Sequence, residues 1–258
     1  AIGFNALAAH VTGGNNTAIG SGALKSNLRS FANTATGANT LSLNTTGDSN
    51  SAFGSDALKN NTDGSANNAF GTEALLTNTT GASNAAFGFS SLNKNTTGSN
   101  NSAFGNTTLS ANTTGNINSA FGSEALQTNT TGSSNAAFGS KSLNKNTVGN
   151  NNTAVGDSTM FANTTGSFNT ALGKAALSLN TTGSSNVAIG RTALLTNTTG
   201  SNNTAIGNGA NVSSGALSNA TALGFGATAN ASNKVRIGGS TVTVIEGQVA
   251  YTFPSDAR

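Results

Sequence analysis

A tripeptide box, Ala-x-Gly, recurs every seventeen residues along most of this 258-residue chain, and its central residue is usually Phe, Ile, Val or Leu. The fourteen box glycines run from Gly3 to Gly224, and every step between them is seventeen residues long. A strict period of this length is typical of a solenoid, in which each repeat packs only on its two neighbours. The period therefore predicts a stacked array of identical coils.

Helical coils are unfavourable, because each repeat carries Gly at two positions and the turn-forming sequence Asn-Thr-Thr-Gly at one of them. Two short strands per coil fit better, one centred on Asn-x-Ala-Phe-Gly and the other on x-Ala-Leu-x-x-Asn. Glycine and asparagine would supply the positive φ that tight turns between strands need. We therefore expect an all-β, parallel β-solenoid or β-roll of seventeen-residue coils with two strands each.

Two kinds of side chain repeat so regularly that we predict ladders along the stack. Buried Asn amides one coil apart can hydrogen-bond to one another and so satisfy polar groups that would otherwise be unpaired. The residue before the box glycine is Phe in six successive coils. The predicted ladders are Asn50, Asn67, Asn84, Asn101, Asn118 and Asn135, and Phe53, Phe70, Phe87, Phe104, Phe121 and Phe138.

Charge placement predicts which part of the coil is buried. The fourteen charged residues of the repeats all avoid the Asn-x-Ala-Phe-Gly segment, so we expect this strand to be buried along its whole length. Ala and Phe are neighbours in it and point to opposite faces. One coil cannot enclose both faces, so we expect a second copy of the chain to cover one of them, and a homotrimer to result.

Composition excludes several classes of protein. Only 7% of residues are charged and the net charge is +3, which is too small to predict a nucleic-acid partner. No run of about eighteen apolar residues predicts a membrane-inserted helix. The chain has no Cys and one His, so neither a metal site nor another cofactor is expected. Polarity supplied by Asn, Thr, Ser and Gly suggests an extracellular or virion-surface location.

Candidate chemistry is sparse. Asp56 and Glu73 share a position in adjacent coils, at a spacing of about 5 Å that retaining glycosidases use, although two solvated carboxylates explain them better. His10 stands where later coils have Asn, which favours a hydrogen-bonding role in the first coil. The Asn-Thr-Thr triplets are formal N-glycosylation sites, but a structural turn ladder is the better interpretation. The accompanying Thr ladder, beginning at Thr45, leaves ice binding as an alternative.

The period breaks after Gly224. Residues 1–224 form the repeat region, and residues 225–258 are expected to form a capping β segment that closes the stack. Residues 225–233 resemble a shortened coil, and residues 234–253 alternate with β character. The first residues, Ala1-Ile2-Gly3, already form a box, so we expect the natural protein to extend further toward the N-terminus.

Two resemblances support a fibre. The unit Asn-x-Ala-(Phe/Ile)-Gly resembles the head repeats of trimeric autotransporter adhesins, which form left-handed parallel β-rolls in homotrimers, although the adhesin unit is shorter and lacks the Asn-Thr-Thr-Gly turn. The ending from Asn233 to Arg258 is similar to the junction before the intramolecular chaperone of endosialidase-type tail fibres. That resemblance implies a processing site at Ser255-Asp256 and a chaperone domain beyond Arg258.

The sequence therefore predicts a structural and adhesive shaft of an extracellular homotrimeric fibre, in a phage tail fibre or a bacterial surface filament. Its partners would be other copies of itself and, through its variable loops, a host-surface glycan or protein receptor. We expect no enzymatic activity. The alternatives are a polysaccharide-degrading enzyme of the tailspike type, which would rely on Asp56 and Glu73, and an ice-binding β-solenoid.

Overall fold

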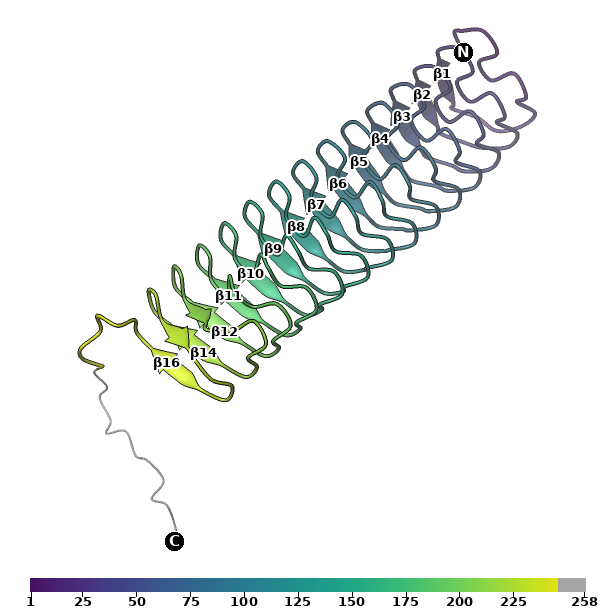
Figure 1. Cartoon of the computed structure of the whole chain (residues 1–258). Helices are drawn as coiled ribbons and strands as arrows, with labels where there is room; N and C mark the ends of the chain where they lie inside the picture. The colour runs from purple at the N-terminus through teal and green to yellow at the C-terminus, as the bar shows by residue number, and fades with distance from the viewer. Residues whose placement is uncertain (246–258) are drawn as a thin grey trace.

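The computed structural model describes residues 1–245 and shows a rod of stacked coils (Figure 1). The repeating coils each contribute one short strand, and these strands form a fourteen-stranded parallel sheet that runs the length of the rod. The strands are β1 (Thr17–Ile19), β2 (Thr34–Thr36), β3 (Ser51–Phe53), β4 (Asn68–Phe70), β5 (Ala85–Phe87), β6 (Ser102–Phe104), β7 (Ser119–Phe121), β8 (Ala136–Phe138), β9 (Thr153–Val155), β10 (Thr170–Leu172), β11 (Val187–Ile189), β12 (Thr204–Ile206), β13 (Asn211–Val212), β14 (Thr221–Leu223), β15 (Thr228–Ala229) and β16 (Val235–Ile237).

The sheet keeps the sequence register along the repeats. From β1 to β14 each strand of the long sheet pairs in parallel with the strand seventeen residues away, so that every box Ala lies beside another box Ala. The last step is fourteen residues, because β16 pairs with β14 through Thr221 and Val235. The parallel β-solenoid of seventeen-residue coils predicted from the period is confirmed. No helix in residues 1–245 is long and apolar enough to span a membrane.

The prediction of a second strand in every coil is wrong. The x-Ala-Leu-x-x-Asn segment forms successive turns, because alternate residues adopt the left-handed conformation, as Asp56 (φ 58°) and Leu58 (φ 50°) do. Left-handed Leu costs about 1–2 kcal/mol. Complete burial of the side chain and a 3.0 Å hydrogen bond from Leu58 N to Ala74 O in the next coil offset that cost. A second strand forms only near the C-terminal end, where β13 pairs with β15.

A hydrophobic core runs along the rod. It contains the box Ala side chains from Ala18 to Ala222 and the Leu four residues after the box glycine from Leu24 to Leu194, with Met160 replacing one Leu, and these side chains are buried. In the strands β1 to β12 and in β14 the central Ala points into this core, as Ala103 does in β6, whereas the central residue of β16 is the exposed Arg236. The flanking residues Ser102 and Phe104 face outward and are partly exposed. A single chain therefore buries one face of the strand, which agrees with the expectation that one coil cannot enclose both faces, and burial of the outward face by another copy stays a prediction.

A ladder of buried Asn amides joins the turns of adjacent coils. The Nδ2 of Asn61 donates to Asn44 Oδ1 in the preceding coil at 2.7 Å and to Gly64 O in its own turn at 2.8 Å. The same pair of bonds recurs at each coil up to Asn197. Both amide hydrogens are used, and the oxygen accepts from the next coil. This column stands beside the predicted one, which begins at Asn50 and lies before the strands.

The second Asn ladder lies just before each strand. Asn118 Nδ2 donates to Asn101 Oδ1 at 3.1 Å and to Gly132 O at 2.9 Å. Its own Oδ1 accepts both the backbone N–H and the Nδ2 of Asn135, at 3.0 and 3.2 Å. The buried side-chain nitrogen and oxygen atoms of the described residues all have hydrogen-bond partners. Each amide therefore ties side chain to side chain and side chain to backbone across a coil boundary.

The turn glycine of Asn-Thr-Thr-Gly is required because neighbouring atoms leave no room for a Cβ. The box glycine is required for the same reason and also because its φ is positive. Gly98 does not have a positive φ, but a Cβ there would lie 2.4 Å from Asn95 Oδ1 and 2.5 Å from Gly115 O. Gly88 has φ +132°, a region that favours glycine, and a Cβ would lie 2.4 Å from Gly105 O. Both glycines allow neighbouring coils to approach at strand spacing.

We expect Asn118→Ala to lower the free energy of unfolding by about 2–4 kcal/mol, because it leaves the buried Asn135 N–H without an acceptor and removes one of the two donors to Gly132 O, which keeps the bond from Asn129 Nδ2. Denaturant unfolding followed by circular dichroism measures the change. Asn106 is exposed and forms no side-chain hydrogen bond, so Asn106→Ala is the matched control, with an expected change below about 0.5 kcal/mol. Equal effects of the two substitutions would contradict the proposed importance of the ladder.

Candidate interaction surface

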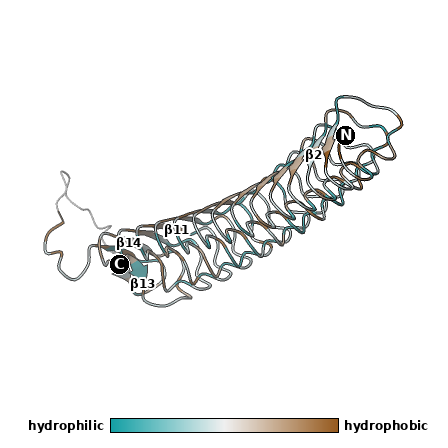
Figure 2. Ribbon diagram, turned by 90° about the horizontal axis from the view of Figure 1, so that it is seen from above, coloured by the Kyte–Doolittle hydropathy of each residue, from teal (hydrophilic) through white to brown (hydrophobic). Residues whose placement is uncertain are grey.

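The outward face of the long sheet is a regular surface that follows the rod, and Figure 2 shows the strands aligned along one side. Two residues of each strand point outward, because side chains alternate along a strand. We call the residue directly before the box glycine, with its counterpart Ile237 in β16, the aromatic column. We call the residue two positions before it, which starts each strand, the small column. Together these two columns are the sheet face.

The aromatic column contains a continuous stack of Phe rings. From Phe53 to Phe138 successive ring centroids lie 4.7–4.9 Å apart, and the ring planes deviate by 4–14°. The predicted Phe ladder is thus confirmed, and the strand spacing of the sheet sets its period. The rings remain partly open to solvent, with Phe53 37% and Phe138 41% exposed. Aliphatic residues continue the column toward both ends, as Ile19 and Ile206 do at 42% exposure.

The sheet face carries no charged side chain over the fourteen strands. Charges lie instead in the turn segments, where some form ladders between coils. Lys141 Nζ lies 3.9 Å from Glu124 Oε2, and Lys174 Nζ lies 4.0 Å from Asp157 Oδ1. Exposed pairs of this kind contribute less than about 1 kcal/mol each. The result is a rod with one uncharged side, on which a mainly apolar column lies beside a column rich in Thr and Ser, and with the charges at its turn segments.

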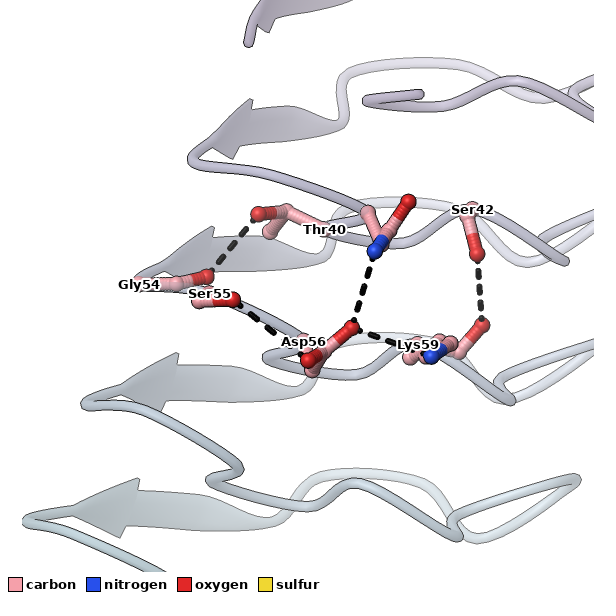
Figure 3. Close-up of polar contacts among 7 residues, drawn as sticks. Thr40, Ser42, Gly54, Ser55, Asp56 and Lys59 are labelled. Atoms are coloured by element: carbon pink, nitrogen blue, oxygen red, sulfur yellow. Dashed lines mark hydrogen bonds and ion pairs between the residues drawn. The ribbon is translucent and has the colours of Figure 1, made fainter. Parts of the chain in front are cut away.

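The carboxylate pair is held by separate partners. Asp56 accepts from Asn39 Nδ2 in the preceding coil at 3.2 Å and lies 3.1 Å from Lys59 Nζ (Figure 3). Glu73 accepts from Ser90 Oγ in the following coil at 3.0 Å. The two carboxylates therefore bond toward opposite ends of the rod. No cavity is found beside them in the described part of the chain.

The electrostatics of Asp56 do not suit an acid catalyst. Burial raises the pKa of the Asp56 carboxyl, but hydrogen bonds from Lys59 and Asn39 outweigh burial and hold the pKa below its usual value. A glycosidase acid needs a raised pKa so that it stays protonated at working pH. The arrangement therefore agrees with the interpretation of Asp56 and Glu73 as carboxylates at the surface, and the structure adds the Lys59 partner of Asp56.

The Asn-Thr-Thr-Gly turns use their polar atoms within the rod. The first Thr of most turns donates its hydroxyl to the backbone of the next coil, as Thr96 Oγ1 does to Thr113 O at 3.0 Å. The turn Asn is fully buried, and its amide nitrogen makes two hydrogen bonds. A glycan on this buried nitrogen would be incompatible with its two bonds, so the hydrogen-bonded ladder agrees with the structural interpretation of these triplets. The hydroxyl groups of these first Thr residues likewise donate to backbone carbonyls of the next coil.

The remaining predictions concern His10, a metal site and the processing site. His10 Nδ1 lies 3.1 Å from Asn27 Nδ2, so His10 takes the place of the turn Asn in the first coil, as predicted. Among residues 1–245 no group of three or more His, Cys, Asp or Glu side chains could hold a metal ion. The predicted processing site, Ser255-Asp256, lies outside the described residues.

The sequence interpretation missed the small column as part of the surface. Residues such as Thr17, Ser102 and Thr204 stand two positions before the aromatic column and share its outward direction. The signal was present, because alternation along a strand places positions i and i+2 on one face. No protein-family model matches this chain, and a search of curated proteins finds no match to its sequence.

Asp56→Asn is expected to lower the free energy of unfolding at pH 7 by less than about 1 kcal/mol, because the ion pair is largely solvated. A lowered folded-state pKa stabilises the fold above the unfolded pKa of about 3.9, and this stabilisation is lost as pH falls through the folded pKa. The difference in the free energy of unfolding between the parent protein and the variant should therefore shrink below about pH 4. Denaturant unfolding across pH 2–7 measures this difference. A difference that grows at low pH would contradict the lowered pKa of Asp56 in the folded state.

Proposed function

We propose that this chain is the shaft of an extracellular homotrimeric fibre, of the kind found in phage tail fibres or bacterial surface filaments. The observation that carries the proposal is the uncharged sheet face, on which a column of Phe and aliphatic side chains, interrupted by Thr36, follows the rod beside a column rich in Thr and Ser, while every charge of the repeats lies elsewhere. Monomeric soluble proteins rarely expose a long contiguous line of large apolar side chains. Association of copies removes the patch from water.

The mechanical properties of the rod suit a shaft. Each coil is bonded to the next through the sheet, the turn backbone and two amide ladders. At about 4.8 Å per coil, thirteen steps span roughly 60 Å. Such a rod holds a receptor-binding tip away from a surface, and its exposed turn residues could contact a host-surface glycan or protein receptor.

The resemblance of the repeat to trimeric adhesin heads, and of the ending to the junction before an endosialidase-type chaperone, supports the same proposal. Both resemblances imply three copies and an extracellular setting. In this proposal the chaperone assembles the trimer and is then released next to Ser255. The work of the shaft itself is mechanical.

The native mass tests the proposal. Light scattering should give about three times the chain mass of 25.2 kDa for the parent protein. Phe87→Lys combined with Phe104→Lys should give a monomer, because three copies cannot bury lysines against one another on the sheet face. Circular dichroism should show that the monomer keeps the parent fold, since both Phe side chains point outward.

The matched control places two lysines at exposed Phe residues outside the sheet face. Phe89 is 51% and Phe168 is 64% exposed, and both stand in turn segments. The Phe89→Lys, Phe168→Lys variant should remain a trimer. A monomeric parent protein would overturn the fibre proposal.

A further inference from the structure

Asn208 is the only asparagine of the chain that is followed by glycine. The pair lies in the turn directly after β12, where the Asn208 side chain is exposed and forms no side-chain hydrogen bond among the described residues. Apart from the chain neighbours of Gly209, no heavy atom lies within 4 Å of the position that a Cβ there would take. The turn therefore places an exposed carboxamide beside an unhindered backbone nitrogen.

The fold does not require glycine at position 209. This residue stands two positions after its box glycine and has φ 68°. Other coils hold a β-branched residue at the same place with a similar backbone, as Thr107 (φ 49°) and Thr192 (φ 55°) do. Neither φ nor packing therefore explains Gly209, and its reactivity beside Asn208 is what distinguishes this turn from the others.

We propose that Asn208-Gly209 is a self-modification site, at which the chain converts its own amide into a carboxylate by deamidation. The Gly209 nitrogen loses its proton and forms a bond to Asn208 Cγ. The bond from Cγ to Nδ2 then breaks, and the nitrogen leaves as ammonia after taking up a proton, so that a five-membered succinimide remains. Water adds to one of the two ring carbonyls and breaks the bond from that carbonyl carbon to the ring nitrogen, which yields aspartate or isoaspartate. The net reaction consumes one water and releases one ammonia.

The coil that holds this pair is tied less firmly than the others. Ring closure requires the Gly209 N–H to leave Arg191 O, to which it donates at 3.0 Å. The amide ladder of the turns ends at Asn197, and Ser214 stands at the next ladder position. A segment with fewer buried bonds opens at a lower free-energy cost. Local opening of this turn therefore gives the nitrogen access to the carboxamide.

The new carboxylate would have a cationic neighbour. Asn208 and Arg191 both stand directly after a box glycine, in adjacent coils, and Arg191 forms no salt bridge within residues 1–245. Asp157 and Lys174 hold the same position in two other adjacent coils, and Asp157 Oδ1 lies 4.0 Å from Lys174 Nζ. The aspartate product should pair with Arg191 in the same way. One added carboxylate lowers the formal net charge from +3 to +2.

Asn106 provides a matched comparison within the same chain. It is also exposed and directly follows a box glycine, and the Thr107 N–H donates to Phe89 O at 2.9 Å as the Gly209 N–H does to Arg191 O. During incubation of the full chain in warm neutral buffer, peptide mass spectrometry should show conversion of Asn208 at least about tenfold faster than of Asn106, because the branched Thr107 side chain crowds the attacking nitrogen. The rate should rise with pH, because that nitrogen must lose its proton.

Exchanging the two following residues tests the cause. Gly209→Thr should slow conversion of Asn208 to the rate at Asn106, and Thr107→Gly should raise conversion of Asn106 toward the rate at Asn208. Circular dichroism should show the parent fold for both variants, since each introduces a residue that other coils hold at this position. Equal rates at the two asparagines of the parent protein, or conversion of Asn208 that Gly209→Thr does not slow, would overturn the proposal. So would an Asn208 that stays intact while Asn106 of the Thr107→Gly variant converts.

The expected ion pair has its own test. Asn208→Asp produces the aspartate form directly and should raise the unfolding temperature by about 1–2 °C at low salt. The same substitution in an Arg191→Gln background should give no rise, and an equal rise in both backgrounds would overturn the pairing with Arg191. Asn208 and Gly209 lie outside the sheet face, so the rates and temperatures measured here are independent of the native mass that tests the fibre proposal.

Discussion

Buried asparagine amides are the interaction on which the rest of this rod depends. The core is made of Ala and Leu side chains that make only non-directional apolar contacts. Such a core does not by itself fix the register between coils. Each ladder amide bonds to the equivalent amide one coil away and to a glycine carbonyl. A slip of one residue would leave many buried polar groups unpaired, at about 1–3 kcal/mol each. The ladders therefore fix the register that aligns every outward side chain.

Much of this arrangement could be predicted from the sequence, because the repeat itself carries the information. The seventeen-residue period indicated the coil, and recurring positions such as Asn101 and Phe104 indicated ladders one coil apart. Charge avoidance located the uncharged segment correctly, but it did not distinguish burial within a chain from an outward face without charge. Phe104 avoids charge and yet points outward.

The turns could not be predicted from residue preferences. Leu rarely adopts a positive φ, and only the complete burial of Leu58 and its bond to the next coil make that conformation favourable. The role of Gly98 could not be predicted either, since its φ is not positive. A side chain is excluded there by the amide of Asn95 and the carbonyl of Gly115. Both features arise from stacking, which a single repeat does not contain.

The sheet face connects this stacking to function. Register between coils produces a continuous column of Phe and aliphatic side chains, interrupted by Thr36. In the proposed fibre, that column would give three identical chains a line of contact, and each added coil would add one more layer of the same interface. The polar turn segments would then stay outside, in contact with solvent.

Hydroxyl-radical footprinting with mass spectrometry tests the burial of the sheet face most directly. Phe121 and Phe138 are 36% and 41% exposed in the single chain, and Phe89 and Phe168 serve as internal references at 51% and 64%. The account predicts that Phe121 and Phe138 are protected in the native protein, while Phe89 and Phe168 are oxidised as their exposure predicts. Oxidation of all four in proportion to their single-chain exposure would show that no copy covers the face, and would contradict the account.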